Sequence, residues 1–308
     1  MLAVASIRPR RVVPRLFLAA LLMATTLGCG HSRSAAPPAA TPRRIVSFSP
    51  ALTRMLVDLG VGAEIVGRTR FCTAADPSVP VVGDLRDVNY ERLLEVTPTH
   101  VYVQAPAAGV DRELAAMATR HGWALHAWDG IDDIDDVERV LRALPATLDP
   151  AFTRDGPTLA TRVAEILNDL AATLVPVAAP GAPGNAGSVL LVYATEPVGV
   201  FGGGTYLDDV LRRLGGTNAV TASGWLEMSL EDVVHLDPSA IIVVRAEAPD
   251  GRDAAAVAGP LGRLDIAAVR RDRVRVLQHP DALLPSTALG EVAESLGVVL
   301  RELGTPES

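Results

Sequence analysis

The chain has 308 residues, 49% of them hydrophobic and 21% charged, which supplies a full core and exceeds the length of one typical domain. The formal net charge of −8 argues against a nucleic-acid-binding protein, because phosphate contacts need a concentrated basic face and the arginines are scattered beyond the N-terminus. Aromatic residues make up only 4% of the chain, so few rings are available to form a binding surface. We expect two lobes.

The N-terminus, residues 1–29, has the pattern of a targeting signal. Several arginines precede an apolar run at residues 16–27, which is too short for a comfortable transmembrane span. The run ends in Gly28 and Cys29 and resembles a bacterial lipobox with its leucine one position late, so we expect Cys29 to be the lipidated N-terminus; an ordinary cleaved signal is the alternative. Residues 30–42, rich in Ala, Pro and Ser, predict a flexible linker.

Cysteine and histidine usage indicates neither a metal site nor a cofactor. With Cys29 lipidated, Cys72 has no disulfide partner and is interpreted as a small buried hydrophobe; a nucleophile would need a histidine beside it. The six histidines show no tight ligand spacing, which argues against the binding proteins of zinc and manganese importers. His279 has two interpretations, an axial ligand to cobalt or iron or a turn residue before Pro280.

Strands and helices alternate through the first part of the chain. Residues 44–48 form an apolar strand, and Ser49 and Pro50 then supply the cap and first position of a helix that Gly60 stops. The same signals predict further strands at residues 64–66, 100–103 and 124–127, and helices at 89–96, 111–121 and about 132–144. Alternation of this kind indicates parallel pairing in an α/β sandwich, here over residues 43–150.

A long helix separates this part from a second one. Apolar residues recur on one helical face from about residue 158 to 174, and we assign residues 151–178 to an interlobe helix. A Pro-, Gly- and Ala-rich connector follows. The second α/β lobe, residues 187–306, has predicted strands at 188–193, 240–244 and 274–277 and helices at 205–214, 229–236 and 286–303.

The strongest signal is an echo between the two parts, found without a gap. Residues 89–103 align with residues 229–243: in both, a capping residue stands two positions before a glutamate, a short helix follows, a polar-Pro pair breaks it, and an apolar strand comes next. Glu91 and Glu231 therefore occupy equivalent first turns. Each alone is explained by the positive helix end; the pair suggests a bidentate docking surface for basic residues of a partner.

These patterns resemble the periplasmic-binding family of cobalamin, heme and ferric-siderophore ABC importers, and its cobalamin-binding branch most. The resemblance covers residues 43–303 and is carried by residues 44–53, Leu59-Gly60, Val66-Gly67, Val82-Gly83, Asn89–Leu93, residues 211–216 with Asn218, and Ser229–Glu231 through Pro238 to Val244. It implies two Rossmann-like lobes joined by one helix, a ligand cleft between them, and docking of Glu91 and Glu231 on arginines of the permease. Arg54 departs from the pattern, because members often carry Glu there.

Ligand contacts are expected where loops follow the carboxyl ends of parallel strands. The candidates are Ser49, Pro50, Arg68, Arg70, Phe71, Asp84, Arg86, Gln104, Trp128, Tyr206, Trp225 and Arg245. The rings offer flat apolar contact to a macrocycle, with core packing as the alternative; the arginines can pair with ligand carboxylates or phosphates, with solvated surface charge as the alternative. The three glycines 202–204 match no phosphate-binding fingerprint and are interpreted as a turn.

We therefore expect a monomeric, extracytoplasmic, lipid-anchored binding protein that captures a bulky chelate, a corrinoid before heme or a ferric siderophore, for a permease and its ATPase subunits. Two alternatives are a ligand sensor for a signalling partner and a surface-anchored hydrolase. The hydrolase is disfavoured because neither a Gly-x-Ser-x-Gly elbow nor a His-Glu-x-x-His run occurs.

Overall fold

The computed structural model describes residues 42–150, 155–176, 186–247, 251 and 253–304. Cys29, the signal segment and all of the predicted linker except Pro42 lie outside these residues. Within the described ranges, no helix combines the length and apolar character needed to cross a membrane. Residues 42–150 are called the N-terminal half below, and residues 186–304 the C-terminal half.

The N-terminal half contains a fully parallel sheet of four strands in the order β2-β1-β5-β6. Its strands are β1 (Ile45–Ser47), β2 (Ile65–Arg68), β5 (His100–Gln104) and β6 (Ala124–Trp128). The elements between them are α1 (Pro50–Asp58), η1 (Gly62–Glu64), the hairpin β3 (Gly83–Asp84) and β4 (Asp87–Val88), α2 (Tyr90–Glu95) and α3 (Arg112–His121). The predicted parallel pairing is confirmed here.

The C-terminal half contains a mixed sheet in the order β10-β8-β7-β11-β12, with β9 paired to β7. Its elements are β7 (Ser188–Thr195), β8 (Val198–Phe201), α6 (Tyr206–Arg213), β9 (Thr217–Asn218), β10 (Trp225–Met228), α7 (Leu230–Leu236), β11 (Ala240–Arg245), α8 (Ala254–Val257), η3 (Gly259–Arg263), α9 (Ala267–Arg270) and β12 (Val274–Gln278). The sequence predicted neither β8 nor β10, and both run antiparallel to their neighbours. Only Glu196 and Pro197 separate β7 from β8, which allows a hairpin but no crossover.

The backbone conformation also repeats between residues 89–103 and residues 229–243. Thr97 and Asp237, at matched positions, end α2 and α7 with φ of 39° and 40°, and each is followed by proline. Two residues later the chain enters its strand through matched hydrogen bonds, Thr99 N to Arg44 O at 2.8 Å and Ser239 N to Ser188 O at 2.9 Å. β5 then lies between β1 and β6, as β11 lies between β7 and β12.

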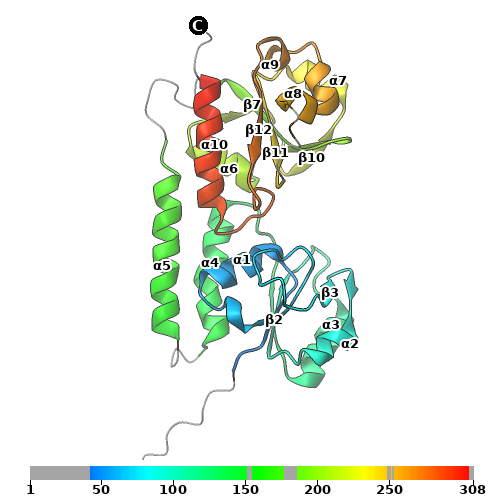
Figure 1. Ribbon diagram of the computed structural model, residues 1–308, viewed down its shortest axis with the longest axis vertical. Coiled ribbons are helices and arrows are strands. Elements are labelled where there is room, and N and C mark those ends of the chain that lie inside the picture. Colours follow the sequence, from blue (N-terminus) through cyan, green and yellow to red (C-terminus); the bar gives the residue numbers. More distant parts are fainter. Residues whose placement is uncertain (1–41, 151–154, 177–185, 248–250, 252, 305–308) are drawn as a thin grey trace, which may run out of the picture. The chain divides into compact units, whose positions relative to one another are not determined.

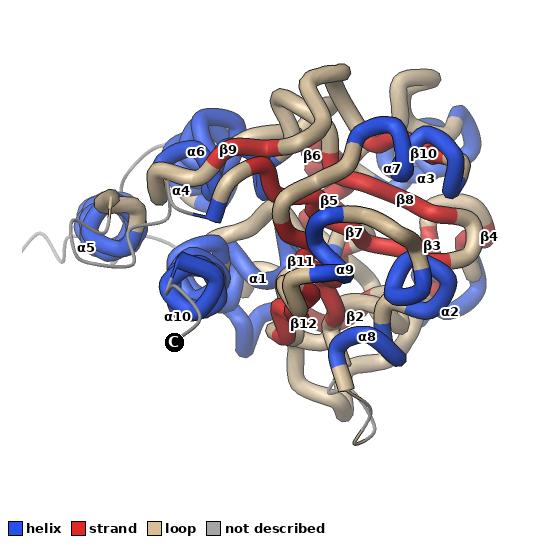
Figure 2. The backbone as a smooth tube through the Cα atoms, turned by 90° about the horizontal axis from the view of Figure 1, so that it is seen from above, coloured by secondary structure: helices blue, strands red, loops and turns tan. Residues whose placement is uncertain are grey.

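Three helices pack together beside the two sheets: α4 (Ile134–Leu148) of the N-terminal half, α5 (Gly156–Thr173) between the halves, and α10 (Leu289–Gly304) of the C-terminal half. α5 packs against α4 and against α10, and Figures 1 and 2 both place these helices together on one side of the sheets. One hydrophobic cluster includes the buried face of α5 and side chains from both halves. α4 was expected to end at residue 144 but continues four residues further, to Leu148, because Leu144 and Leu148 are buried against this core.

The pKa of His126, on β6, is lowered to about 4, first by burial and then by the nearby His100. Its Nε2 has no hydrogen-bond partner among the described residues. The folded protein therefore holds this imidazole neutral, while the unfolded chain takes up a proton near the ordinary pKa of 6.5. Its contribution to stability is present above pH 6.5 and is lost as the pH falls toward 4.

We predict that His126→Phe loses less stability than the wild type between pH 7 and pH 5. The expected difference in the free energy of unfolding is about 1 kcal/mol, because the partly exposed ring of His126 is partly screened by solvent. Urea unfolding at the two pH values measures it. His121→Phe, which removes an exposed histidine, is the control and should follow the wild type. Equal losses in all three proteins would contradict the assignment.

Candidate functional site

The carboxyl ends of three neighbouring strands bring Ser49, Gln104 and Trp128 together. Ser49 caps α1 by accepting a hydrogen bond from Leu52 N at 3.3 Å and donates to Gln104 Oε1 at 3.1 Å. Gln104 is the strand partner of Trp128, whose ring stacks on Tyr102 with centroids 5.9 Å apart. Ser49 is buried, so it supports this surface, while Gln104 and Trp128 are partly exposed. Pro50 occupies the first position of α1.

The loop after β2 is held at its base by hydrogen bonds from Arg68 and has an exposed tip. The guanidinium of Arg68 donates to the carbonyls of Val79, Thr69 and Pro77 at 3.1–3.2 Å, so its charge is used to hold the loop. At the tip, Phe71 is 55% exposed and the guanidinium carbon of Arg70 lies 4.7 Å from its ring centroid. A cation over an exposed ring is a surface suited to a flat or anionic ligand. Arg70 and Phe71 are available to a ligand; Arg68 serves the loop.

The hairpin β3–β4 follows this loop in the sequence and carries Asp84 and Arg86 at its turn. Asp84 Oδ1 accepts hydrogen bonds from the backbone of Arg86 at 2.9 Å and of Asp87 at 3.2 Å, which closes the turn. The turn requires Gly83, whose φ is +96° and where a Cβ would come within 2.2 Å of Asp87 O. The side chain of Arg86 is exposed. Asp84 therefore shapes the turn that displays Arg86.

In the C-terminal half, Trp225 is the exposed member of an aromatic cluster. It is 46% exposed, and its ring centroid lies 4.6 Å from that of Phe201 and 5.0 Å from that of Tyr193. Tyr206 lies 5.9 Å from Trp225, is only 1% exposed and donates its hydroxyl to Ala282 O at 3.1 Å. Burial raises the pKa of Tyr206. Tyr206 thus supports Trp225 from beneath.

The sequence rule placed Trp225 on a loop after a parallel strand, and this placement is wrong. Trp225 begins the antiparallel edge strand β10 and pairs with Phe201 of β8. The rule also missed Tyr193, because this residue lies within β7. Its contact with Trp225 comes from the hairpin reversal after β7, which alternation in the sequence did not reveal.

Arg245 and His279 lie at the carboxyl ends of the neighbouring strands β11 and β12. Arg245 ends β11 opposite Gln278 and is partly exposed. Both ring nitrogens of His279 have partners: Nε2 lies 3.2 Å from Glu291 Oε2, and Nδ1 accepts from Asp281 N at 3.1 Å. His279 therefore has a local structural function. No group of three or more metal-ligating side chains occurs in the part of the chain that the structure describes.

Cys72 and the glycines at 202–204 also have local explanations. Cys72 is fully buried, with its sulfur 3.2 Å from Thr69 Oγ1. Gly202 contributes its carbonyl to Thr205 Oγ1 at 2.8 Å, just before the cap of α6. These groups shape loops at the base of the candidate surface.

Glu91 and Glu231 occupy matched, exposed positions in the first turns of α2 and α7. Asn89 and Ser229 cap the two helices by accepting from the backbone three residues on, at 3.0 and 3.1 Å. One turn after each glutamate stands an exposed apolar side chain, Leu94 at 40% and Val234 at 43%. Sequence reasoning overlooked this apolar pair, although both residues stand at the same place in the echo.

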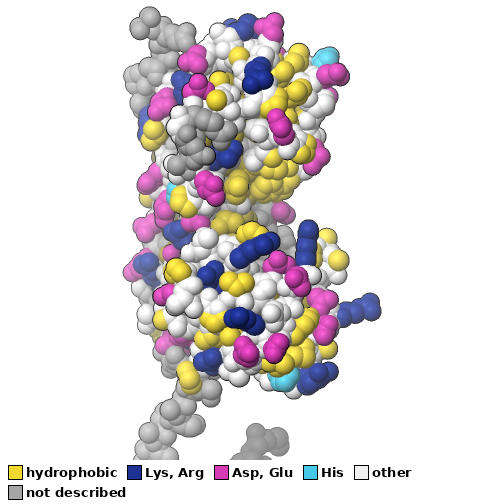
Figure 3. Space-filling model, turned by 45° about the vertical axis from the view of Figure 1, so that its right-hand side comes forward, with side chains coloured by type: hydrophobic (Ala, Val, Ile, Leu, Met, Phe, Trp, Pro, Cys, Tyr) yellow, Lys and Arg dark blue, Asp and Glu magenta, His cyan; other side chains and the backbone are white. Residues whose placement is uncertain are grey.

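The surface between the halves is hollowed in the space-filling view. Hydrophobic side chains gather on both sides of the hollow, with arginine side chains close by on the N-terminal side (Figure 3). This distribution fits a ligand with a large apolar body and anionic groups at its edge.

Neither a search with family models nor a search of curated protein sequences finds a match to this chain. Solved structures do match. The periplasmic heme-binding protein RhuT from Roseiflexus sp. RS-1 is 20% identical, with a TM-score of 0.67 over 86% of this chain and 100% of its own. The periplasmic vitamin B12-binding protein BtuF of Vibrio cholerae is 19% identical, with a TM-score of 0.61 over 85% and 97%.

A third match is the siderophore-binding protein FhuD from Vibrio cholerae, described with Fe³⁺-Desferal bound. It is 16% identical, with a TM-score of 0.67 over 86% of this chain and 100% of its own. The chain therefore has the mixed α/β fold of the periplasmic heme-, B12- and siderophore-binding proteins, and the resemblance inferred from its sequence is confirmed at the level of the fold. All three matched proteins are binding proteins rather than enzymes.

We predict that Arg68→Ala loosens the loop that carries Arg70 and Phe71. Loss of three hydrogen bonds to backbone carbonyls should raise the amide exchange rate across residues 69–80 without unfolding the sheet. Hydrogen–deuterium exchange with mass spectrometry measures this. Arg70→Ala, at the exposed tip, is the matched control and should leave exchange in the loop unchanged. Equal exchange in Arg68→Ala and the wild type would contradict the pinning role.

Proposed function

We propose that this chain is the extracytoplasmic substrate-binding protein of an ABC importer. The observation that carries the proposal is the duplicated α/β scaffold, which presents exposed rings and arginines from both halves and whose solved counterparts bind heme, vitamin B12 or a siderophore. In this proposal residues 43–150 and 187–306 are two lobes, residues 151–178 hold the helix that joins them, and the ligand lies between the lobes. No bond is made or broken.

The ligand we favour is a corrinoid. Phe71 and Trp225 offer ring faces to a wide, flat body, and burying such faces orders few rotatable bonds. Arg70, Arg86 and Arg245 supply cations for phosphate or carboxylate groups at the edge of the ligand. Heme and a ferric siderophore share the combination of an apolar body and anionic groups, and they are the alternatives.

The remaining roles follow from delivery of this ligand at a membrane. Cys29 is the proposed lipid anchor, residues 30–42 the tether, and Glu91 and Glu231 the docking residues for a permease whose ATPase subunits drive release. The exposed Leu94 and Val234 beside the two acids support docking, because an interface gains most from apolar contacts surrounded by polar ones. The chain acts as a monomer in this scheme.

The first experiment is a calorimetric and absorbance titration of the mature chain with cyanocobalamin, hemin and ferric desferrioxamine. We expect saturable 1:1 binding of cyanocobalamin. Binding of hemin or ferric desferrioxamine alone would identify one of the alternative ligands, and binding of none would contradict the proposed function.

Trp225→Ala should weaken this binding about tenfold or more, the effect of about 1.4 kcal/mol expected when a central aromatic contact is removed. Val298→Ala on α10 is a matched control, since Val298 is also 46% exposed but lies on another element. A loss of affinity in Val298→Ala as large as that in Trp225→Ala would contradict the assignment of Trp225 to the site.

We further predict that Glu91→Ala with Glu231→Ala abolishes uptake while leaving ligand affinity unchanged. Glu113→Ala is the matched control, because Glu113 is an exposed carboxylate in the first turn of α3 and has the same relation to its helix end. Uptake of the radiolabelled ligand by cells measures transport, and titration of the purified variant measures affinity. Normal uptake by the double variant would remove the docking role.

A further inference from the structure

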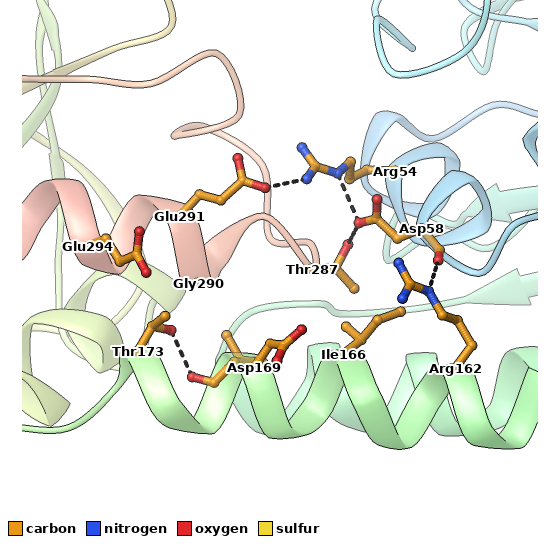
Figure 4. Close-up of a pocket in the computed structure, with 11 residues that line it drawn as sticks. Arg54, Asp58, Arg162, Ile166, Asp169, Thr173, Thr287, Gly290, Glu291 and Glu294 are labelled. Atoms are coloured by element: carbon orange, nitrogen blue, oxygen red, sulfur yellow. Dashed lines mark hydrogen bonds and ion pairs between the residues drawn. The ribbon is translucent and has the colours of Figure 1, made fainter.

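Arg54, on α1 of the N-terminal half, forms ion pairs with two residues of the C-terminal half. Its Nη1 lies 2.6 Å from Asp281 Oδ2, in the segment after β12, and its Nη2 lies 2.6 Å from Glu291 Oε1, on α10. Its Nε contacts Asp58 Oδ2, on its own helix, at 2.9 Å. Figure 4 shows Arg54 and Glu291 facing each other from the two helices. The guanidinium of Arg54 thus forms ion pairs with three carboxylates, one from its own half and two from the other half.

The network is shielded from water over most of its extent. The side chain of Arg54 is 20% exposed and that of Asp281 10%, whereas Glu291 is 57% exposed. Burial opposes the charge on Arg54, but hydrogen bonds and charges from Asp58 and Glu291 outweigh it and raise the pKa of Arg54. Burial likewise opposes the charge on Glu291, and Arg54 and then His279 lower its pKa overall. Arg54 and Glu291 are therefore both charged at neutral pH.

A second link runs parallel to the first. Thr287 Oγ1 donates a hydrogen bond to Asp58 Oδ2, so α1 also holds the segment just before α10. Arg162 of α5 donates to Asp58 O at 2.8 Å, which ties the long helix to the same end of α1. Polar contacts thus join α1, α5 and α10 at one place.

The three helices do not pack closely here. A cavity of about 280 Å³ lies between them, lined by Arg54, Asp58, Ile166, Leu170, Gly290 and Glu294 among others (Figure 4). Beside this cavity, polar side chains link α1 to α10 and to the segment just before it. Such links can break and re-form without displacing close-packed apolar groups.

The links also lie close to the candidate ligand surface. Arg54 is one helical turn beyond Ser49 and Pro50, which follow β1, and Asp281 stands three residues beyond the end of β12. A change in the spacing of α1 and residue 281 would therefore move the strand ends of one half relative to those of the other.

We propose that Arg54 is a positioning residue that clasps the two halves together, sets the width of the space between them and restrains their separation when ligand leaves. The consequence for ligand release rests on the proposed function; the clasp itself does not. Glutamate at this position would face Asp58, Asp281 and Glu291 and drive the halves apart.

The test measures the distance between the halves directly. Spin labels are attached at Glu113→Cys on α3 and Asp265→Cys before α9, both exposed positions, in the mature chain carrying Cys29→Ser. Cys72 is fully buried, and the parent without the two introduced cysteines checks that this thiol takes up no label. Double electron–electron resonance should give one narrow distribution for the parent. Arg54→Gln should shift and broaden it, with the population of longer distances rising about fivefold, the effect of a partly exposed ion pair. Arg54→Lys, which keeps the charge but cannot serve three acceptors in the same geometry, should give an intermediate distribution.

Two variants keep the test decisive if Arg54→Gln fails to fold with Asp281 left unpaired. Arg54→Gln with Asp281→Asn removes both charges, and Glu291→Gln alters the most exposed partner; each should broaden the distribution. Arg142→Gln, which breaks an exposed ion pair within α4, is the matched control and should match the parent. An unchanged distribution in the Arg54 and Glu291 variants, or an equal change in Arg142→Gln, would overturn the proposal.

Ligand release provides a second readout. Stopped-flow dissociation of bound cyanocobalamin, hemin or ferric desferrioxamine should be about fivefold faster from Arg54→Gln than from Arg142→Gln. If none of the three probes binds, the proposed function fails, while the distance measurement still judges the clasp. A dissociation rate unchanged by Arg54→Gln, with a broadened distance distribution, would refute the clasp's effect on release.

Discussion

The structure depends on one helix whose apolar face needs both halves of the chain to cover it. Six side chains on or just beyond α5, from Leu159 to Leu174, are at most 8% exposed, and they are covered by α4 on one side and α10 on the other. Burying each such side chain contributes roughly 1.5–3 kcal/mol, so losing this cover would cost about as much as the whole stability of a typical domain. Neither half can turn freely away from α5, and the strand ends that carry the candidate ligand contacts are held accordingly.

Duplication explains why the two halves offer matched features. The same order of capped helix, left-handed residue, proline and buried strand occurs around Thr97 and around Asp237, and it places a carboxylate and an apolar residue on the surface each time. Arg54 breaks this equivalence. It has partners across the halves, and it stands where α1 and α10 are separated by a cavity rather than packed. The repeated segments thus account for the similar scaffolds of the two halves. Arg54, which is not part of the repeat, accounts for a direct link between them.

Local signals in the sequence were enough to predict most of the fold. Ser49, Asn89 and Ser229 cap the helices that they were expected to cap, and the apolar spacing of residues 158–174 predicted α5 to within two residues. What the sequence could not reveal depends on distant contacts. The antiparallel β8 and β10 follow from a two-residue reversal, the helix through Pro145 follows from tertiary burial, and two of the three partners of Arg54 are more than 220 residues away. For the candidate site, sequence reasoning proposed Phe71, Arg70 and Trp225 but could not distinguish these exposed residues from supporting residues such as Arg68 and Tyr206, whose partners are backbone carbonyls.

The central claim is that one ligand is held by both halves at once. Hydrogen–deuterium exchange of the mature chain, with and without saturating cyanocobalamin, hemin or ferric desferrioxamine, tests it most directly. The account predicts that the bound probe slows exchange in residues 69–86 of the N-terminal half and in residues 223–228 of the C-terminal half together. Slowed exchange in only one half, or only along α1, α5 and α10 beside the cavity, would contradict it.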